Sequence, residues 1–342
     1  MPNIIEAHGL GKVFKVPCRP SGAWNALRAL VLPETAAKVA IQDISFSVAE
    51  GELLALLGPN GAGKSTTIKI LTGILTPSSG SARVAGLVPY RDRRQSARNI
   101  GVVFGQRSQL WWDLPACESF KILRDIYGVG QAQYRTRMAE LDQLLEISSF
   151  WDTRVRHLSL GQRVRCDVAA ALLHDPPVVF LDEPTIGMDA VAKQQVREML
   201  RHEVEERGRS VLLTTHDMTE VERLARRVVL INDGRLVVDG TLADIRSRFA
   251  GTWRITALLS SRELLDRVCP DGLKIVDIRG QQVIFGPDPD AGTITKCMAV
   301  RALAERYEMY DMRVEESDLE DIMRLAYTHG QEKKLGVGQS PS

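Results

Sequence analysis

Eight residues near the start of the chain have the types and spacing that bind a phosphate chain. Residues 58–65 read Gly-Pro-Asn-Gly-Ala-Gly-Lys-Ser and match the pattern GxxxxGKS/T. Glycines let backbone N–H groups turn toward phosphate oxygens, and a following helix presents its positive end to the same charge. We expect Lys64 to reach the β- and γ-phosphates and Ser65 to ligate Mg²⁺. A glycine turn without a ligand is the alternative, and the Lys64-Ser65 pair argues against it.

The nucleotide-binding residues predicted for this loop run one position into the helix. They are Gly58, Pro59, Asn60, Gly61, Ala62, Gly63, Lys64, Ser65 and Thr66.

A second group of candidates follows an apolar run farther along the chain. Residues 178–181 are apolar, and two adjacent carboxylates follow them, Asp182 and Glu183. Charges at the end of a buried strand are tolerated where they are paired or hold a cation. We expect Asp182 to bind Mg²⁺, directly or through water, and Glu183 to polarise the water that attacks the γ-phosphate. Such a pair on its own would favour a cap or turn role, but the upstream phosphate loop favours the catalytic interpretation.

Alternating strands and helices must position these groups. Apolar, β-branched runs that alternate with helical patterns predict an α/β fold, with a largely parallel sheet covered on both faces. The predicted strands are Ile41–Val48, Leu53–Leu57, Asn99–Phe104, Val178–Leu181, Val211–Thr214, Val228–Ile231 and Leu236–Val238. The predicted helices are Thr66–Leu75, Glu118–Tyr127, Gln133–Leu145 and Val191–Glu206.

The pattern changes after residue 249, so we predict a first domain over residues 1–249 and a small α+β domain over residues 250–330. The expected strands of the second domain are Trp253–Leu259, Leu273–Asp277, Gln282–Phe285 and Met309–Val314. Helices are expected at Arg262–Val268, between the third and fourth strands, and at the end. Residues 331–342, which are rich in Gly, Lys and Ser, are predicted to be a disordered tail.

Composition narrows the function classes. The 342-residue chain carries 44 basic and 43 acidic residues, a balance that argues weakly against a nucleic-acid partner. No apolar run approaches the roughly 20 residues that cross a bilayer, and the start lacks a signal-peptide pattern. We therefore expect a cytoplasmic chain that attaches to a membrane through another subunit. The five cysteines are scattered, without the spacing of a zinc site or a disulfide framework.

Residues 158–162, Leu-Ser-Leu-Gly-Gln, resemble the LSGGQ signature of the ATP-binding cassette (ABC) superfamily and lie shortly before the Asp182-Glu183 strand. The resemblance covers roughly residues 4–249. It implies a P-loop NTPase cassette with an insertion at about residues 15–40 and a helical subdomain at about residues 107–170. The signature departs from the family pattern at Leu160, which is normally glycine. Ser159 and Gly161 remain, so the site is expected to stay competent.

The resemblance also assigns roles to single residues. By position, Gln106 looks like the Q-loop glutamine, which implies a catalytic and metal-binding role, and Asp189 belongs to the D-loop-like residues 186–189. His216 looks like the switch histidine that senses the γ-phosphate, although a lone histidine is more often a plain surface or core residue. Phe14 is the candidate for stacking on adenine, and a core-packing role for it stays open.

In this family two cassettes meet head to tail, and the signature of one completes the phosphate pocket of the other. Ser159, Gly161 and Gln162 would then act on the nucleotide of the partner copy. Ser159 could equally cap the helix that begins near Gly161, and both roles are compatible because they use the same helix end. The implied cofactors are ATP and Mg²⁺.

The form of the phosphate loop, the single cassette and the C-terminal extension resemble the ATPase subunits of ABC-2-type exporters. That resemblance implies transmembrane permease subunits and a second cassette as partners, at the cytoplasmic face of the inner membrane. We expect the second cassette to be an identical copy, although two different cassettes stay open, and we expect no nucleic-acid partner. Trp111 and Trp112 either anchor a partner helix or pack into the helical subdomain. Trp24, Leu27 and Val31 of the insertion either pack locally or meet a membrane surface or partner.

Other functions are less consistent with these residues. A P-loop kinase would not need residues 158–162 or a hydrolytic Glu183. A soluble ABC ATPase that acts on nucleic acid or the ribosome would be expected to carry coiled-coil arms or a second cassette, and no repeat is visible. An ABC importer ATPase stays open as an alternative, and the C-terminal domain favours export.

Overall fold

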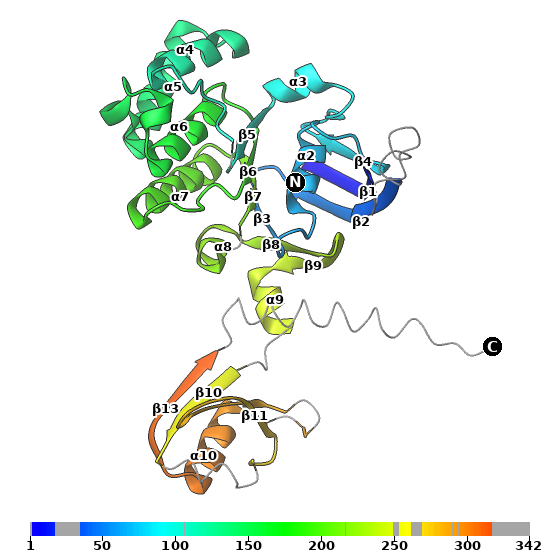
Figure 1. Cartoon of the computed structure of the whole chain (residues 1–342), viewed down its shortest axis with the longest axis vertical. Coiled ribbons are helices and arrows are strands. Elements are labelled where there is room, and N and C mark those ends of the chain that lie inside the picture. Colours follow the sequence, from blue (N-terminus) through cyan, green and yellow to red (C-terminus); the bar gives the residue numbers. More distant parts are fainter. Residues whose placement is uncertain are drawn as a thin grey trace, which may run out of the picture. The chain divides into compact units, whose positions relative to one another are not determined.

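A six-stranded sheet forms the core of the first part of the chain, in the order β5-β6-β7-β3-β8-β9 (Figure 1). The computed structural model describes residues 2–17, 35–105, 107–215, 217–248, 253–260, 269–288, 291–292 and 294–316. Contacts divide the chain into two units, residues 1–242 and 243–342. The domain boundary after residue 249 stays a prediction.

The first five strands in this order, from β5 through β3 to β8, are parallel, and β9 runs antiparallel to β8. Their bounds are β3 (Leu53–Leu57), β5 (Ile100–Phe104), β6 (Val178–Asp182), β7 (Ser210–Thr214), β8 (Arg227–Asn232) and β9 (Arg235–Thr241). Every residue of β3 and β7 is buried, as expected for strands with both faces covered. The predicted α/β fold with a largely parallel sheet is confirmed.

A second, antiparallel sheet covers one face of this core, with helix α2 (Lys64–Leu71) in the same apolar cluster. Its order is β2-β1-β4, with β1 (Asn3–Pro17), β2 (Thr35–Ala49) and β4 (Ser79–Val84). Helix α2 ends at Leu71, four residues before the predicted end at Leu75. The phosphate loop therefore leads into a helix that is packed on both sides, which makes its N-terminus a rigid support.

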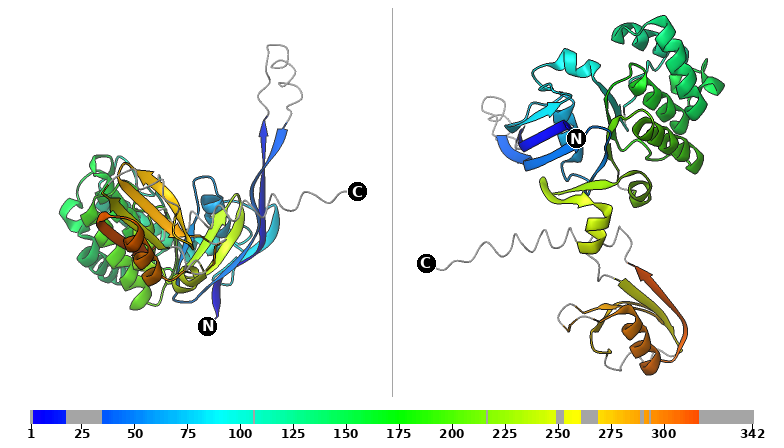
Figure 2. Two further views of the ribbon diagram at one scale, coloured as in Figure 1. Left: turned by 90° about the horizontal axis from the view of Figure 1, so that it is seen from below. Right: turned by 180° about the vertical axis from the view of Figure 1, so that it is seen from behind.

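Strands β1 and β2 continue past the body as a two-stranded ribbon, paired as far as Pro17 and Thr35 (Figure 2). The predicted insertion at about residues 15–40 thus begins and ends as β-structure. Val13 and Val39 face each other across the ribbon and are 41% and 56% exposed. The helical spacing predicted from Trp24, Leu27 and Val31 lies outside the described residues.

Helices on the other side of the sheet carry the signature residues. They are α4 (Ala116–Tyr127), α5 (Gln131–Leu145), α6 (Leu160–Leu172), α7 (Ala190–Glu205) and α8 (Met218–Leu224), with the short α3 (Arg93–Arg98) before β5. Arg137 of α5 donates to Glu203 of α7 at 2.6 Å, and both side chains are buried. This paired charge ties the helical layer together. The helices predicted at residues 118–127, 133–145 and 191–206 are confirmed.

The second unit is a four-stranded antiparallel sheet in the order β11-β12-β10-β13, with α10 (Lys296–Arg306) packed on one face. The strands are β10 (Trp253–Leu259), β11 (Leu273–Arg279), β12 (Gln282–Pro287) and β13 (Met309–Glu316), and α9 (Leu242–Arg248) precedes them. All four predicted strands are confirmed. The predicted helix at residues 262–268, the final helix and the tail lie outside the described residues. Within the described parts of the chain, no helix is long and apolar enough to cross a membrane.

Candidate functional site

The phosphate loop connects β3 to α2 and is closely packed on two sides, by β8 and by β2. A Cβ on Gly58 would lie 2.3 Å from the carbonyl oxygen of Ile231 in β8. A Cβ on Gly63, whose φ is +112°, would lie 2.5 Å from Cγ2 of Ile41 in β2. Only glycine satisfies this packing, so the loop needs its glycines for close approach as well as for phosphate binding.

Lys64 is buried and folded back over the loop. Its Nζ donates to the carbonyl oxygen of Gly58 at 2.6 Å and to that of Pro59 at 3.3 Å. The same Nζ lies 3.6 Å from Oε1 of Glu183. The ammonium group therefore sits between the loop carbonyls and the carboxylate predicted to activate water.

Asp182 lies at the end of β6 and joins three elements. Its Oδ1 accepts hydrogen bonds from Ser65 Oγ at 3.2 Å and from Thr214 Oγ1 at 2.7 Å. Ser65 belongs to α2 and Thr214 to the end of β7. A hydroxyl and a carboxylate oxygen at this spacing form the hard-oxygen donor set that Mg²⁺ prefers, so the residues present fit the predicted metal.

Glu183 follows immediately and has a left-handed backbone, with φ of 54°. Its N–H donates to both the carbonyl oxygen and Oγ1 of Thr214, each at 3.0 Å. The side chain is 23% exposed. A non-glycine residue in this conformation is held there by its surroundings, and such backbone strain clusters at functional sites. The carboxylate is thus fixed at its base and open to solvent.

Thr214 is a site residue that the sequence reasoning missed. It holds Asp182 and Glu183 together, although it lies 32 residues after Asp182. The available signal was a polar residue at the carboxyl end of an apolar strand. Parallel strands collect such residues at one edge of the sheet.

Gln106 and His216 lie outside the described residues, but their neighbours are placed. The N–H of Gly105 donates to the carbonyl oxygen of Asp182 at 2.8 Å, so the chain enters the predicted Q-loop beside the acidic pair. On the other side, Thr215 Oγ1 donates to the buried Glu220 at 2.9 Å and accepts from the N–H of Asp217 at 3.0 Å.

Asp217 itself caps α8 and forms an ion pair with Lys193 at 3.1 Å. Burial raises the pKa of Asp217, but the hydrogen bond and charge of Lys193 outweigh burial and hold the pKa below its usual value. The backbone on both sides of position 216 is therefore anchored by paired side chains.

The signature residues form the start of α6. Ser159 Oγ accepts from the N–H of Gln162 at 3.2 Å, and Gln162 Oε1 accepts from the N–H of Ser159 at 2.9 Å, which makes a complete capping box. The capping role predicted for Ser159 is confirmed, and the side chain is exposed. An action on the nucleotide of a second copy stays a prediction.

The D-loop residues lie directly beside this helix start. Asp189 Oδ1 accepts from the N–H of Ala192 at 2.8 Å and caps α7. A Cβ on Gly161 would lie 3.1 Å from Cβ of Ala192, so the two helix starts are in close contact. Leu160, the departure from the family pattern, reaches toward Gly187, where a Cβ would lie 2.8 Å from Leu160 Cδ2. The added leucine is accommodated because residue 187 is glycine.

Phe14 lies on β1 opposite Lys38, half-buried, with Lys12 Nζ 5.4 Å from the centre of its ring. Both roles predicted for Phe14 remain open. Trp111 and Trp112 are 39% and 51% exposed, and Arg163 of α6 lies 5.4 Å from the ring centre of Trp112. The tryptophans are thus partly supported by the signature helix and still present surface to solvent.

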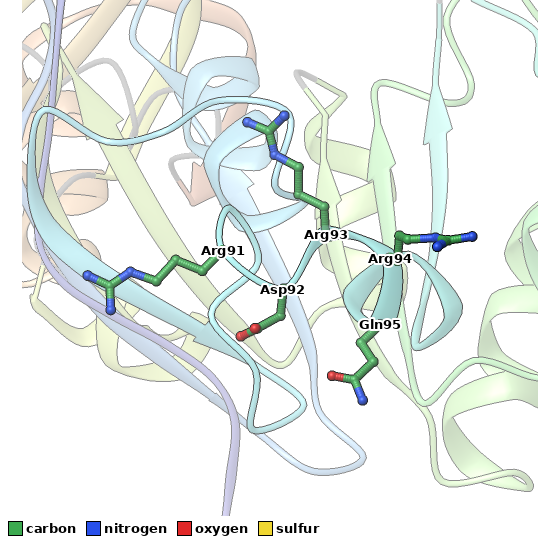
Figure 3. Close-up of a pocket in the computed structure, with 5 residues that line it drawn as sticks. All are labelled: Arg91, Asp92, Arg93, Arg94 and Gln95. Atoms are coloured by element: carbon green, nitrogen blue, oxygen red, sulfur yellow. The ribbon is translucent and has the colours of Figure 1, made fainter.

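A hollow of about 380 Å³ lies elsewhere in the first unit, around the start of α3 (Figure 3). It is lined by Arg91, Asp92, Arg93, Arg94 and Gln95. None of the predicted site residues lines it, so it is separate from the phosphate loop.

Comparisons with known proteins agree with these features. Residues 41–186 match the family described as "ABC transporter". The chain is 41% identical over 204 residues to the Nod factor export ATP-binding protein I of Paraburkholderia xenovorans, covering 59% of this chain and 66% of the relative. It is 30% identical over 289 residues to the linearmycin resistance ATP-binding protein LnrL of Bacillus subtilis, covering 83% of this chain and 92% of the relative.

A third relative is much longer than this chain. ABC transporter A family member 8 of Dictyostelium discoideum is 32% identical over 267 residues, which cover 78% of this chain but only 30% of the relative. Among solved structures, one described as the ATP binding subunit of an ABC transporter superposes with a TM-score of 0.61 at 28% identity, covering 72% of this chain and 93% of that one.

Proposed function

Because this chain belongs to the ABC transporter family, as one of its ATP-binding cassette ATPases, we propose that it hydrolyses ATP to drive a membrane exporter of the ABC-2 type. The family and the cassette fold that residues 158–162 implied are confirmed. The single observation that carries the proposal is the gathering of Lys64, Ser65, Asp182 and Glu183 at one edge of the parallel sheet.

Each of these side chains has a separate task in hydrolysis. Lys64 would exchange the loop carbonyls for phosphate oxygens and neutralise their charge. Ser65 and Asp182 would hold Mg²⁺, which supplies charge neutralisation on the phosphate oxygens when bound. Glu183, fixed through its backbone to Thr214, would orient the attacking water and accept its proton.

We further propose that two copies of the chain form the working ATPase. Ser159 and Gln162 satisfy each other within one copy, yet Ser159 is exposed at a helix N-terminus, where anions bind well. Asp189 starts a neighbouring helix on the same surface. The signature of one copy would close over the nucleotide of the other, so ATP would hold the pair together and hydrolysis would release it.

Export rather than import is supported by the relatives. Two of them are named for Nod factor export and linearmycin resistance. Trp111 and Trp112 follow the Q-loop position and offer aromatic surface to a helix of a transmembrane permease. The chain would then work at the cytoplasmic face of the membrane, held there by the permease subunits.

Co-purification tests the proposal. The tagged chain is expressed in its native cell, membranes are extracted in mild detergent, and the stoichiometric partners are identified by mass spectrometry. We expect a polytopic membrane protein, and less of it with Trp112→Ala than with the control Trp253→Phe, a conservative change in the apolar core of the second unit. Recovery with ribosomes or DNA instead would reject the transporter assignment.

A further inference from the structure

Asp167 is a buried carboxylate in the middle of the signature helix α6, and no step of the proposed reaction uses it. The residue is 5% exposed. Its Oδ1 accepts hydrogen bonds from Ser108 Oγ at 2.8 Å and from the N–H of Gln109 at 3.1 Å. Gln109 Nε2 also donates to the main-chain carbonyl oxygen of Asp167 at 3.0 Å. One helix residue therefore makes three bonds to two consecutive residues of another segment.

That segment leaves the predicted Q-loop and leads to the exposed tryptophans. Ser108 follows Gln106 by two residues, and its Oγ also accepts from the N–H of Leu110 at 3.2 Å. The N–H of the next residue, Trp111, donates to Ser119 of α4 at 3.2 Å. The bonds to Asp167 thus fix the path of the chain between the nucleotide edge of the sheet and the surface at residues 111–112.

The same helix carries the signature at its other end. α6 begins at Leu160, after the Ser159 cap, and Asp167 lies two turns farther on. A helix of this length moves as a rigid body because each turn is bonded to the next. A displacement of the signature end would therefore be passed through Asp167 to Ser108 and Gln109.

Burying the carboxylate of Asp167 costs desolvation free energy. Burial raises the pKa of Asp167 to about 6, against the opposing effects of the bonds from Ser108 and Gln109 and the charge of Arg163. An apolar residue would pack this position without that cost. Charged acceptors, however, make stronger and more directional bonds to backbone N–H groups than apolar contacts can provide.

We propose that Asp167 is a positioning residue that makes the segment after the Q-loop and the signature helix move as one unit when nucleotide binds. The inference rests on the proposed function, since it concerns how nucleotide binding at the signature reaches the tryptophan surface. Asp167 acts through Ser108 and Gln109 and touches no nucleotide.

Hydrogen exchange, measured by mass spectrometry on the full chain, tests the link directly. The N–H of Gln109 donates to Asp167, so its exchange rate reports whether that bond is made. The parent is Glu183→Gln, which is expected to keep ATP bound. In the parent, ATP·Mg²⁺ should slow exchange in peptides spanning residues 105–114 and 158–166. With Asp167→Ala added, exchange in 105–114 should be at least about tenfold faster and should no longer respond to ATP, while 158–166 should still respond.

Two further variants separate positioning from folding. Ser108→Ala removes one of the bonds to Asp167, together with the bond from the N–H of Leu110, and leaves Asp167 in place. It should give the same change at smaller size even if Asp167→Ala is unstable. Asp142→Ala is the matched control, because Asp142 also accepts a backbone N–H, that of Ser148 at 2.6 Å, but lies on α5. It should behave like the parent. With Glu183 restored, Asp167→Ala should lower kcat about tenfold and leave KM within about threefold.

The outcomes are distinguishable. If the parent shows no response to ATP in either peptide, the proposed function itself fails. If the parent responds and both Asp167→Ala and Ser108→Ala keep a normal response in residues 105–114, the link through Asp167 is wrong.

Discussion

The nucleotide edge of the central sheet and the signature surface are held together by different means in this chain. At the sheet edge, Lys64 comes from α2 and the Asp182-Glu183 pair from the end of β6, and these side chains or their backbone are paired with one another or with Thr214 of β7. At the signature surface, Ser159 and Asp189 are satisfied within their own helix starts, by Gln162 and Ala192. The first region is assembled by the sheet, and the second is complete within each helix end.

The difference supports the proposal that two copies form the working ATPase. Groups that bond across strands already converge on one point, where a phosphate chain and its metal fit. Helix ends that cap themselves expose donors on a surface without enclosing a ligand. We therefore expect substitutions at the sheet edge to act within their own copy, and substitutions at the signature to act on the partner copy.

The largest expected effect belongs to Glu183→Gln. Removing the base should lower ATP turnover about 10³-fold, while ATP affinity stays within about threefold, because general-base catalysis contributes to the transition state and not to ground-state binding. Phosphate release and nucleotide titration measure the two quantities. Glu118→Gln, an exposed glutamate on α4, is the control. Normal turnover of Glu183→Gln would show that Glu183 is not the catalytic base.

Asp167→Asn tests how the helix of the signature is supported. The folded-state pKa of Asp167 is raised to about 6, so its protonated form stabilises the fold at low pH and that contribution is lost as pH rises through 6. Asparagine does not titrate. The unfolding free energy of Asp167→Asn, minus that of the unsubstituted chain, should therefore rise by up to about 3 kcal/mol between pH 4 and pH 7.5.

Urea unfolding of both proteins across this pH range measures the difference in unfolding free energy. The protonation of all other groups contributes equally to both proteins and cancels. A difference that stays constant with pH would show that the Asp167 carboxyl is not held in the buried environment described.

Lys64→Ala should weaken ATP binding by about 10- to 100-fold, since a charge-assisted bond to phosphate is lost. Lys69→Ala on the exposed face of the same helix is the matched control. Binding can be followed with a fluorescent ATP analogue. Equal affinity for both variants would mean that Lys64 keeps its bonds to the loop carbonyls when nucleotide is bound.

The smallest effect gives the sharpest test of the comparison. Ser159→Phe and Lys64→Ala should each abolish turnover alone, but their equimolar mixture should recover about a quarter of the activity of the unsubstituted chain, because half of the dimers contain one intact site of two. ATPase assays of the mixture at increasing total concentration measure it. Absence of recovery would mean that the signature serves the nucleotide of its own copy.

Local patterns predicted much of this molecule. The phosphate loop, the Asp182-Glu183 pair and the signature are contiguous, and each carries its chemistry in a few adjacent residues. The strands of the sheet were equally visible, because buried parallel strands are short apolar runs. The end of α2 was predicted less accurately, because the helix stops at the C-cap Thr72 and is followed by Gly73, whose left-handed φ of +76° ends it before Leu75.

Tertiary structure alone decided the contacts between distant segments. Thr214 meets Asp182 because β7 lies beside β6 in register, and the order of strands is not written in any one of them. Asp167 meets Gln109, and Leu160 meets Gly187, because helices pack at particular rotations. The sequence by itself determined which side chains can bind phosphate and activate water. The fold determined which of them touch, because short-range chemistry sets residue type while sheet order and packing set distance.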